Sequence, residues 1–141
     1  MDPKVIEKLR AKGLKCTPQR IDIINGIVRA PGHCTVETTY EQAKAKDPGI
    51  SVSTVYRTLE TLVEIGELKI INVSRYKNYY DTKLVSHHHI VCIKCGKIED
   101  IKVNMNCKDR CLDQETKDHY TLIDGTCLFN AICEHCRLKG I

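Results

Sequence analysis

Apolar residues recur at helical spacing four times within the first 66 residues of the chain. The spacing predicts four helices, over 3–13, 18–30, 35–46 and 51–66. Thr17, Thr35 and Ser51 stand where N-cap residues are expected, and Pro18 suits a first helical position. The predicted helix ends carry turn residues, namely Gly13, Ala30-Pro31-Gly32, Asp47-Pro48-Gly49 and Gly66.

The same spacing predicts which side of each helix is buried. In the second helix the expected inward residues are Ile21, Ile24 and Val28. In the third helix they are Val36, Tyr40 and Ala43. In the fourth helix they are Val52, Val55, Leu59, Leu62, Val63 and Ile65.

Two strand-like segments, 67–73 and 78–82, follow the fourth helix and enclose the basic turn S-R-Y-K. Helices followed by a basic hairpin are typical of a winged helix, a DNA-binding fold whose wing contacts the backbone or the minor groove. The sequence therefore predicts an N-terminal winged-helix DNA-binding domain over residues 1–82.

The second half of the chain has weaker patterns. They predict a strand over 98–103, a helix over 104–118, and strands over 120–123 and 127–132. If 86–92 also form a strand, His87 and His89 share one face, and His88, Ile90 and Cys92 share the other. The last strand is apolar, as expected of a sheet that forms a dimer.

Charge and cysteine content differ between the two halves. Residues 1–83 carry 14 Lys and Arg against 10 Asp and Glu, whereas residues 84–141 carry 8 of each. The basic half suits an anionic partner such as DNA. No signal peptide and no membrane-spanning run is found, so we expect a cytoplasmic protein without a membrane partner. Nine cysteines then favour reduced thiols and bound metal over disulfides.

Two C-x-x-C pairs supply the four thiolates of a closed tetrahedral zinc site. These ligands are Cys92, Cys95, Cys133 and Cys136. The histidines at 87 and 89 indicate a second metal site of different chemistry, with nitrogen and oxygen ligands. Cys107, Cys111 and Cys127 fit no complete ligand set, and their role stays open.

The outer side of the fourth helix offers small hydroxyls, one aromatic ring and one arginine to a major groove. An ordinary solvated helix with a serine cap is the alternative explanation of the same residues. The predicted DNA contacts are Lys15, Ser51, Ser53, Thr54, Tyr56, Arg57 and Arg75.

Four motifs together resemble the ferric uptake regulator (Fur) family. They are T-P-Q-R (17–20), S-V-S-T-V-Y-R-T-L (51–59), H-H-H-I-V-C-I-K-C-G-K-I-E-D (87–100) and C-E-H-C (133–136). The resemblance implies a homodimeric, metal-dependent repressor of α+β class that binds double-stranded operator DNA. After the winged helix it implies a hinge at 83–86 and, over 87–141, a small α/β dimerisation domain with a four-cysteine zinc site.

The resemblance also implies two metal ions per subunit. One is a structural Zn²⁺ on the four cysteines. The other is a regulatory Fe²⁺ or Mn²⁺ between the domains, whose implied ligands are His33, Asp81, His87, His89 and Asp100.

Residues at single positions indicate which branch of the family the chain resembles. No cysteine lies between 66 and 86, which disfavours the zinc sensors. Asp81 stands where iron sensors usually carry glutamate and so resembles the peroxide-sensing PerR branch, in which His33 or His87 would be oxidised. Arg57 instead favours the iron sensors, because the well-known peroxide sensors carry asparagine there. Gly125 replaces a histidine of the iron sensors' additional site, which we expect to be missing.

Three alternatives remain open. The first is an iron-responsive repressor of iron uptake without peroxide sensing. The second is a zinc hydrolase with Glu99 or Asp100 as general base, although no H-E-x-x-H motif occurs. The third is a metal-storage module. We favour the peroxide-sensing repressor, which is not an enzyme, over these three alternatives.

Overall fold

The computed structural model describes residues 3–74, 77–103, 112–123 and 125–140. The chain divides into two compact units, Met1–Leu84 and Val85–Ile141. This division falls within the 83–86 segment for which a hinge is predicted. Within the described residues no helix is both long and apolar enough to cross a bilayer.

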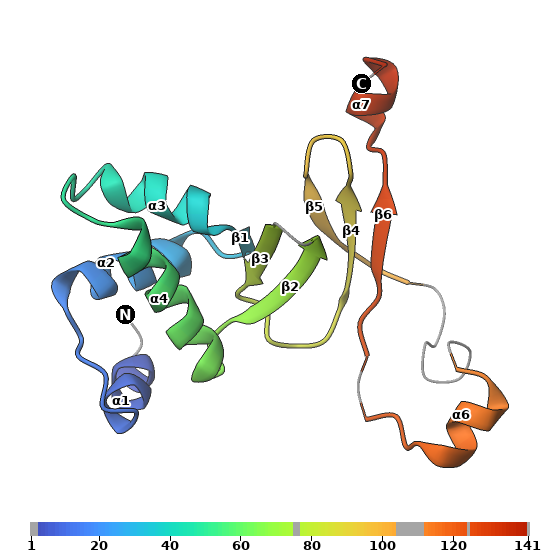
Figure 1. Ribbon diagram of the computed structural model, residues 1–141, viewed down its shortest axis with the longest axis horizontal. Helices are drawn as coiled ribbons and strands as arrows, with labels where there is room; N and C mark the ends of the chain where they lie inside the picture. The colour runs from blue at the N-terminus through green and yellow to red at the C-terminus, as the bar shows by residue number, and fades with distance from the viewer. Residues whose placement is uncertain (1–2, 75–76, 104–111, 124, 141) are drawn as a thin grey trace. The chain divides into compact units, whose positions relative to one another are not determined.

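Four helices form most of the first unit: α1 (Pro3–Ala11), α2 (Pro18–Arg29), α3 (Val36–Lys44) and α4 (Val52–Glu64) (Figure 1). The predicted caps are confirmed. The hydroxyl of Thr17 accepts from the Arg20 N–H, and the hydroxyl of Ser51 accepts from the Thr54 N–H. Thr35 and Thr38 cap α3 reciprocally, each side chain accepting from the other's backbone N–H.

The buried face of α2 differs from the prediction. Ile23, Ile24 and Ile27 enter the core, whereas Val28 is 58% exposed. The run I-D-I-I-N-G-I-V contains two overlapping sets of helical spacing, and packing buries the set with Ile23 and Ile27 instead of the set with Ile21 and Val28.

The prediction for α4 is wrong at one position, because Val52 is 50% exposed. Thr58 and Thr61 are buried on this helix instead. Each hydroxyl donates to the carbonyl four residues earlier, at 2.7 Å, so neither buried oxygen lacks a partner. Val55, Leu59 and Leu62 form the rest of the buried face, as predicted.

A three-stranded antiparallel sheet completes the first unit. Its strands are β1 (His33–Cys34), β2 (Lys69–Ser74) and β3 (Lys77–Asp81), in the order β1-β3-β2. The β2–β3 hairpin is the predicted wing, and together with the helices it makes a winged helix. Arg75, predicted to contact DNA from this wing, lies outside the described residues. β1 was not predicted, because two residues are too few to show a periodic pattern.

The second unit is built on β4 (His88–Cys92), with antiparallel β5 (Ile98–Ile101) on one side and parallel β6 (Leu128–Ala131) on the other (Figure 1). The helices among its described residues are α6 (Gln114–His119) and α7 (Glu134–Leu138). Helices and sheets occur in both units, so the predicted α+β class is confirmed.

Two predictions for the second unit are corrected, and one of its helices was missed. The described part of the helix predicted over 104–118 begins only at Gln114, because Asp113 adopts an extended backbone and caps the helix through the Thr116 N–H. Residues 104–111, with Cys107 and Cys111, lie outside the described residues. Residues 120–123 form no strand, and α7 was not predicted.

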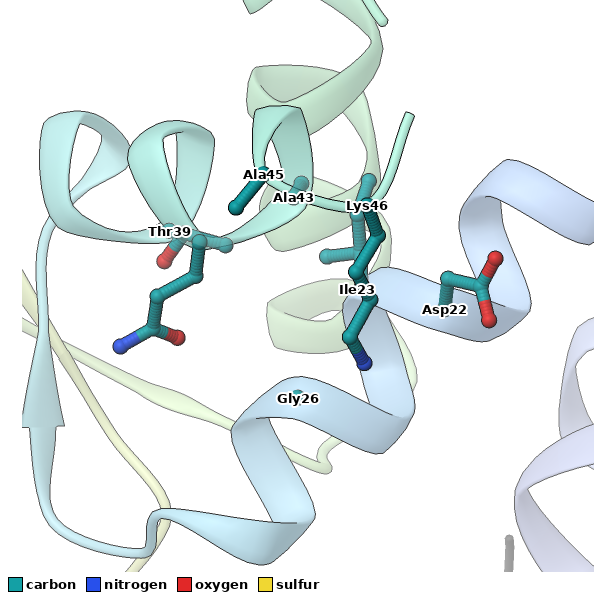
Figure 2. Close-up of a pocket in the computed structure, with 8 residues that line it drawn as sticks. Asp22, Ile23, Gly26, Thr39, Ala43, Ala45 and Lys46 are labelled. Carbon is teal, nitrogen blue, oxygen red and sulfur yellow. The ribbon is translucent and has the colours of Figure 1, made fainter. Parts of the chain in front are cut away.

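A cleft of about 360 Å³ lies between α2 and α3 in the first unit (Figure 2). Small residues leave this space open: Gly26 on α2, and Ala43 and Ala45 at the end of α3. Asp22 and Lys46 are the charged residues of its lining. Packing between the two helices is therefore incomplete at Gly26.

Candidate functional site

The four predicted zinc cysteines converge within the second unit. β4 ends at Cys92, and the turn that follows carries Cys95. β6 runs parallel to β4 with Ala131 opposite Cys92, so the chain leaving β6 brings Cys133 and Cys136 to the same end of the sheet. All four sulfur atoms lie within 4.8 Å of one another.

The spacing of these sulfur atoms fits zinc. A tetrahedron with Zn–S bonds of ~2.3 Å has S···S edges of ~3.8 Å. The Sγ atoms of Cys95 and Cys133 lie 3.8 Å apart. The four cysteines can therefore hold Zn²⁺ with little rearrangement.

Backbone amides prepare one of these thiols for a metal. The Cys133 N–H donates to Cys92 Sγ at 3.3 Å. This bond, followed by a second from the Cys95 N–H, lowers the pKa of Cys92 to about 6. Burial instead raises the pKa of Cys136 to about 12. Zinc binding at neutral pH would therefore have to displace the proton of Cys136.

A second group in the same unit combines His87, His89 and Asp100. His89 and Asp100 are paired residues of the β4–β5 ladder. Asp100 Oδ1 lies 3.1 Å from His87 Nε2 and 3.8 Å from His89 Nε2. The two imidazole rings have centroids 4.4 Å apart, so His87 and His89 lie side by side as predicted, although β4 begins only at His88 and His87 precedes the strand.

The tautomer of His87 favours a cation at this group. Its Nδ1 lies 2.8 Å from the carbonyl oxygen of Val85. A carbonyl oxygen only accepts, so Nδ1 carries the proton, and in the neutral ring Nε2 carries a lone pair. That lone pair faces a carboxylate oxygen, an arrangement that a metal ion or an added proton stabilises.

His88 has a different environment from its two neighbours. Its Nδ1 accepts a hydrogen bond from the Cys127 N–H at 3.0 Å, which ties β4 to the residue that precedes β6. His88 and the backbone of Cys127 therefore have a structural role in the sheet. No local pattern of residues indicates this pairing, because it joins positions distant in the chain.

The first unit brings His33 and Asp81 together. They are paired residues of the β1–β3 ladder, and His33 Nε2 lies 3.8 Å from Asp81 Oδ2. The other carboxylate oxygen of Asp81 accepts from the Lys83 N–H at 2.8 Å. Asp81 is 1% exposed, and the hydrogen bond from the Lys83 N–H offsets part of the cost of burying its polar side chain.

Two of the hydroxyls predicted to face DNA from α4 are hydrogen-bonded within the helix cap. Ser51 and Thr54 bond to each other through their hydroxyls at 2.9 Å, and both belong to the helix cap. Ser53, Tyr56 and Arg57 are exposed and available to a partner. Lys15, which precedes α2, is exposed as well.

The sequence and the structure match known proteins over nearly their whole length. The sequence model of the ferric uptake regulator family matches residues 11–125 of this chain. The peroxide-responsive repressor PerR of Staphylococcus epidermidis is 30% identical over 135 residues, covering 96% of this chain and 89% of the relative. The ferric uptake regulation protein of Bacillus subtilis is 30% identical over 142 residues, covering 96% of this chain and 94% of the relative.

Solved structures give the same result. The ferric uptake regulator of Helicobacter pylori superimposes with a TM-score of 0.80 at 25% identity, covering 95% of this chain and 89% of that one. The peroxide stress regulator of Campylobacter jejuni superimposes with a TM-score of 0.64 at 31% identity, covering 96% of this chain and 100% of that one. Proteins of this family are dimeric regulators of transcription and not enzymes. This chain belongs to the ferric uptake regulator family of metal-responsive, DNA-binding regulators.

Proposed function

We propose that the chain is a repressor that binds double-stranded operator DNA as a homodimer when a regulatory metal is bound. The observation that carries the proposal is that each unit holds histidine nitrogen against a carboxylate without sulfur: His33 with Asp81, and His87 and His89 with Asp100. The regulatory metal would take all five residues as ligands and thereby link the reading unit to the dimerisation unit.

The donor chemistry indicates which metal each site takes. Imidazole and carboxylate ligands suit Fe²⁺ or Mn²⁺, whereas four thiolates suit zinc. We therefore assign one structural Zn²⁺ per subunit to Cys92, Cys95, Cys133 and Cys136, and one Fe²⁺ or Mn²⁺ to the histidine and aspartate residues. A coupling of ~1–3 kcal/mol between metal and DNA would change operator affinity ~5- to 150-fold.

DNA recognition would use α4 in the major groove. In a homodimer two such helices read half-sites about one helical turn apart. Tyr56 and Arg57 would contact base edges, and Ser53 and Lys15 would contact bases or phosphates. The metal sets the spacing of the two helices by fixing each reading unit on its dimerisation unit.

Peroxide would end repression by damaging a ligand. Bound Fe²⁺ would relay two electrons from the imidazole ring to hydrogen peroxide and would end in its starting oxidation state. The net change is insertion of one peroxide oxygen into an imidazole C–H bond of His33 or His87, while the other oxygen leaves as water. The oxidised ring binds metal poorly, so the protein would leave its operator. Each subunit reacts once, without turnover.

The test compares operator binding of the zinc-loaded protein with Fe²⁺, Mn²⁺ or no added metal, before and after peroxide. We expect tight binding with either metal, and loss of binding after peroxide only with Fe²⁺. Peptides holding His33 or His87 should then gain the mass of one oxygen atom. The peptides of His119 and His135, outside the proposed ligand set, are internal controls. Operator binding of equal affinity with Fe²⁺, with Mn²⁺ and without added metal would overturn the proposal.

A second candidate is an iron-responsive repressor without peroxide sensing. It is favoured by Arg57, which is exposed on α4 and matches the iron sensors in this position. Sequence identity does not decide between the two candidates, because a PerR and a ferric uptake regulation protein are each 30% identical to this chain. Iron-dependent binding with unmodified His33 and His87 after peroxide would identify this candidate as correct.

A further inference from the structure

The first turn of α4 exposes an apolar side chain. Val52 is the first residue of this helix and is 50% exposed, although helical spacing predicted its burial. Tyr56, four residues later and therefore on the same side of the helix, is 46% exposed. Neither side chain completes the core, which is formed on the opposite side by Val55, Leu59 and Leu62.

Two of the three hydroxyls in this turn, those of Ser51 and Thr54, are already engaged, and the third belongs to the exposed Ser53. The Ser51 hydroxyl accepts from the Thr54 N–H at 3.1 Å and bonds to the Thr54 hydroxyl at 2.9 Å. A base that approached either hydroxyl would compete with the helix cap. Without loss of the cap, the first turn offers the Ser53 hydroxyl and one apolar group, the isopropyl group of Val52.

We propose that Val52 is a specificity-determining residue that contacts the C5-methyl group of a thymine in the operator. The inference rests on the proposed reading of DNA by α4. Residues at the N-terminus of a recognition helix lie against base edges, and the thymine methyl is the apolar feature of the major groove.

A valine is suited to this contact. Its χ1 angle is nearly fixed within a helix, so its methyl groups are positioned before DNA binds and lose little freedom. Helix stability does not explain the residue, because valine is a weaker helix former than alanine. Removing one methyl group from water on binding corresponds to ~4-fold in affinity.

The experiment first selects an operator from random duplex DNA with the metal-loaded, full-length protein. Each thymine of the selected operator is then replaced by deoxyuridine, which lacks only the methyl group. We expect one thymine per half-site whose replacement weakens binding ~4-fold for each methyl lost. The Val52→Ala variant should bind the thymine operator more weakly and should be indifferent to deoxyuridine at that position alone.

The matched control is Val28→Ala, which removes an exposed valine from α2. This variant should respond to every deoxyuridine as the native protein does. Circular dichroism should show both variants folded, because alanine favours helices. If Val52→Ala and the native protein respond alike to every deoxyuridine, the Val52 proposal is wrong while the proposed function stands. If the protein selects no sequence at all, the proposed function is overturned and the Val52 proposal with it.

Discussion

Asp81 lies opposite His33 across the β1–β3 ladder, with its Oδ2 atom 3.8 Å from the ring nitrogen Nε2. The pairing depends on β1, a strand of only two residues. Hydrogen bonds between Gly32 and Thr82 hold the strand in place: the Gly32 N–H donates to the Thr82 hydroxyl, and the Thr82 N–H donates to the Gly32 carbonyl. Two potential ligands distant in sequence are thus fixed on one rigid sheet.

Replacing Asp81 with asparagine should abolish the response to metal. Asparagine keeps the shape and can still accept from the Lys83 N–H, but it lacks the negative charge that a divalent metal needs. We expect Asp81→Asn to retain zinc and to bind the operator ~5- to 150-fold more weakly than the native protein at saturating Mn²⁺. Fluorescence anisotropy during a Mn²⁺ titration measures this change.

The control for Asp81→Asn is Asp22→Asn, at an exposed position of α2. It removes the same charge from the same unit and should leave the Mn²⁺ response unchanged. Native-like Mn²⁺ dependence in Asp81→Asn would exclude this residue from the regulatory ligands.

The helices of the first unit were predictable because their apolar spacing and caps agree. The buried face of α2 was not predictable, because its four isoleucines and one valine are compatible with more than one buried side of the helix. The exposure of Val52 was also missed, since spacing alone does not tell a core valine from one that faces a partner. β1 and α7, of two and five residues, are too short for periodicity and form through tertiary contacts.

Predictability of the site depends on how local each ligand set is. The cysteines were predictable from two short-range pairs whose chemistry specifies zinc. His87 and His89 were predictable from strand alternation. His33 and Asp81 stand alone in the sequence, and only a family resemblance linked them. The β1–β3 register that places them side by side is a long-range contact that no local pattern encodes.

Loss of one zinc ligand should unfold much of the second unit. Cys95→Ser removes a thiolate from the four-sulfur group, and small units depend strongly on such metals. We expect the zinc content, measured by mass spectrometry of the native protein, to fall from one per subunit to near zero. The midpoint of thermal unfolding should fall as well.

Cys127→Ser is the matched control for Cys95→Ser. Cys127 lies just before β6 in the same unit, and it contributes its backbone N–H, not its sulfur, to the bond with His88. Zinc should remain bound in this variant. Zinc loss from Cys127→Ser but not from Cys95→Ser would contradict the ligand assignment.

Glu37, in the first turn of α3, should make stability depend on acid. Its own backbone N–H, and then the Thr35 hydroxyl, hold the pKa of the carboxyl below its usual value. A depressed pKa stabilises the fold above the unfolded value of ~4.3, and this contribution is lost as pH falls through the folded value. Glu37→Gln should therefore lower the urea midpoint at pH 7 and should differ progressively less from the native protein on acidification. Glu41→Gln, one turn later and exposed, controls for loss of charge, and an equal pH dependence there would contradict the assignment.

Gly26→Ala should stabilise the protein, because the glycine lies within α2 beside the cleft between α2 and α3 (Figure 2). A Cβ atom there meets nothing within 4 Å, and its backbone is that of an ordinary helix. Alanine restricts the unfolded chain without strain, which should raise the free energy of unfolding by ~0.5–1 kcal/mol. Urea unfolding of the zinc-loaded protein, followed by circular dichroism, measures the change.

Gly66→Ala is the opposite case and the control for Gly26→Ala. Gly66 ends α4 with φ of +76°, where a Cβ atom is strained although the space around it is open. The same substitution should therefore destabilise the protein here. The two variants separate backbone conformation from available space, because neither glycine has a neighbour within reach of the added atom. If Gly26→Ala were destabilising instead, α3 would have to pack directly on Gly26 in solution, and the cleft would be closed.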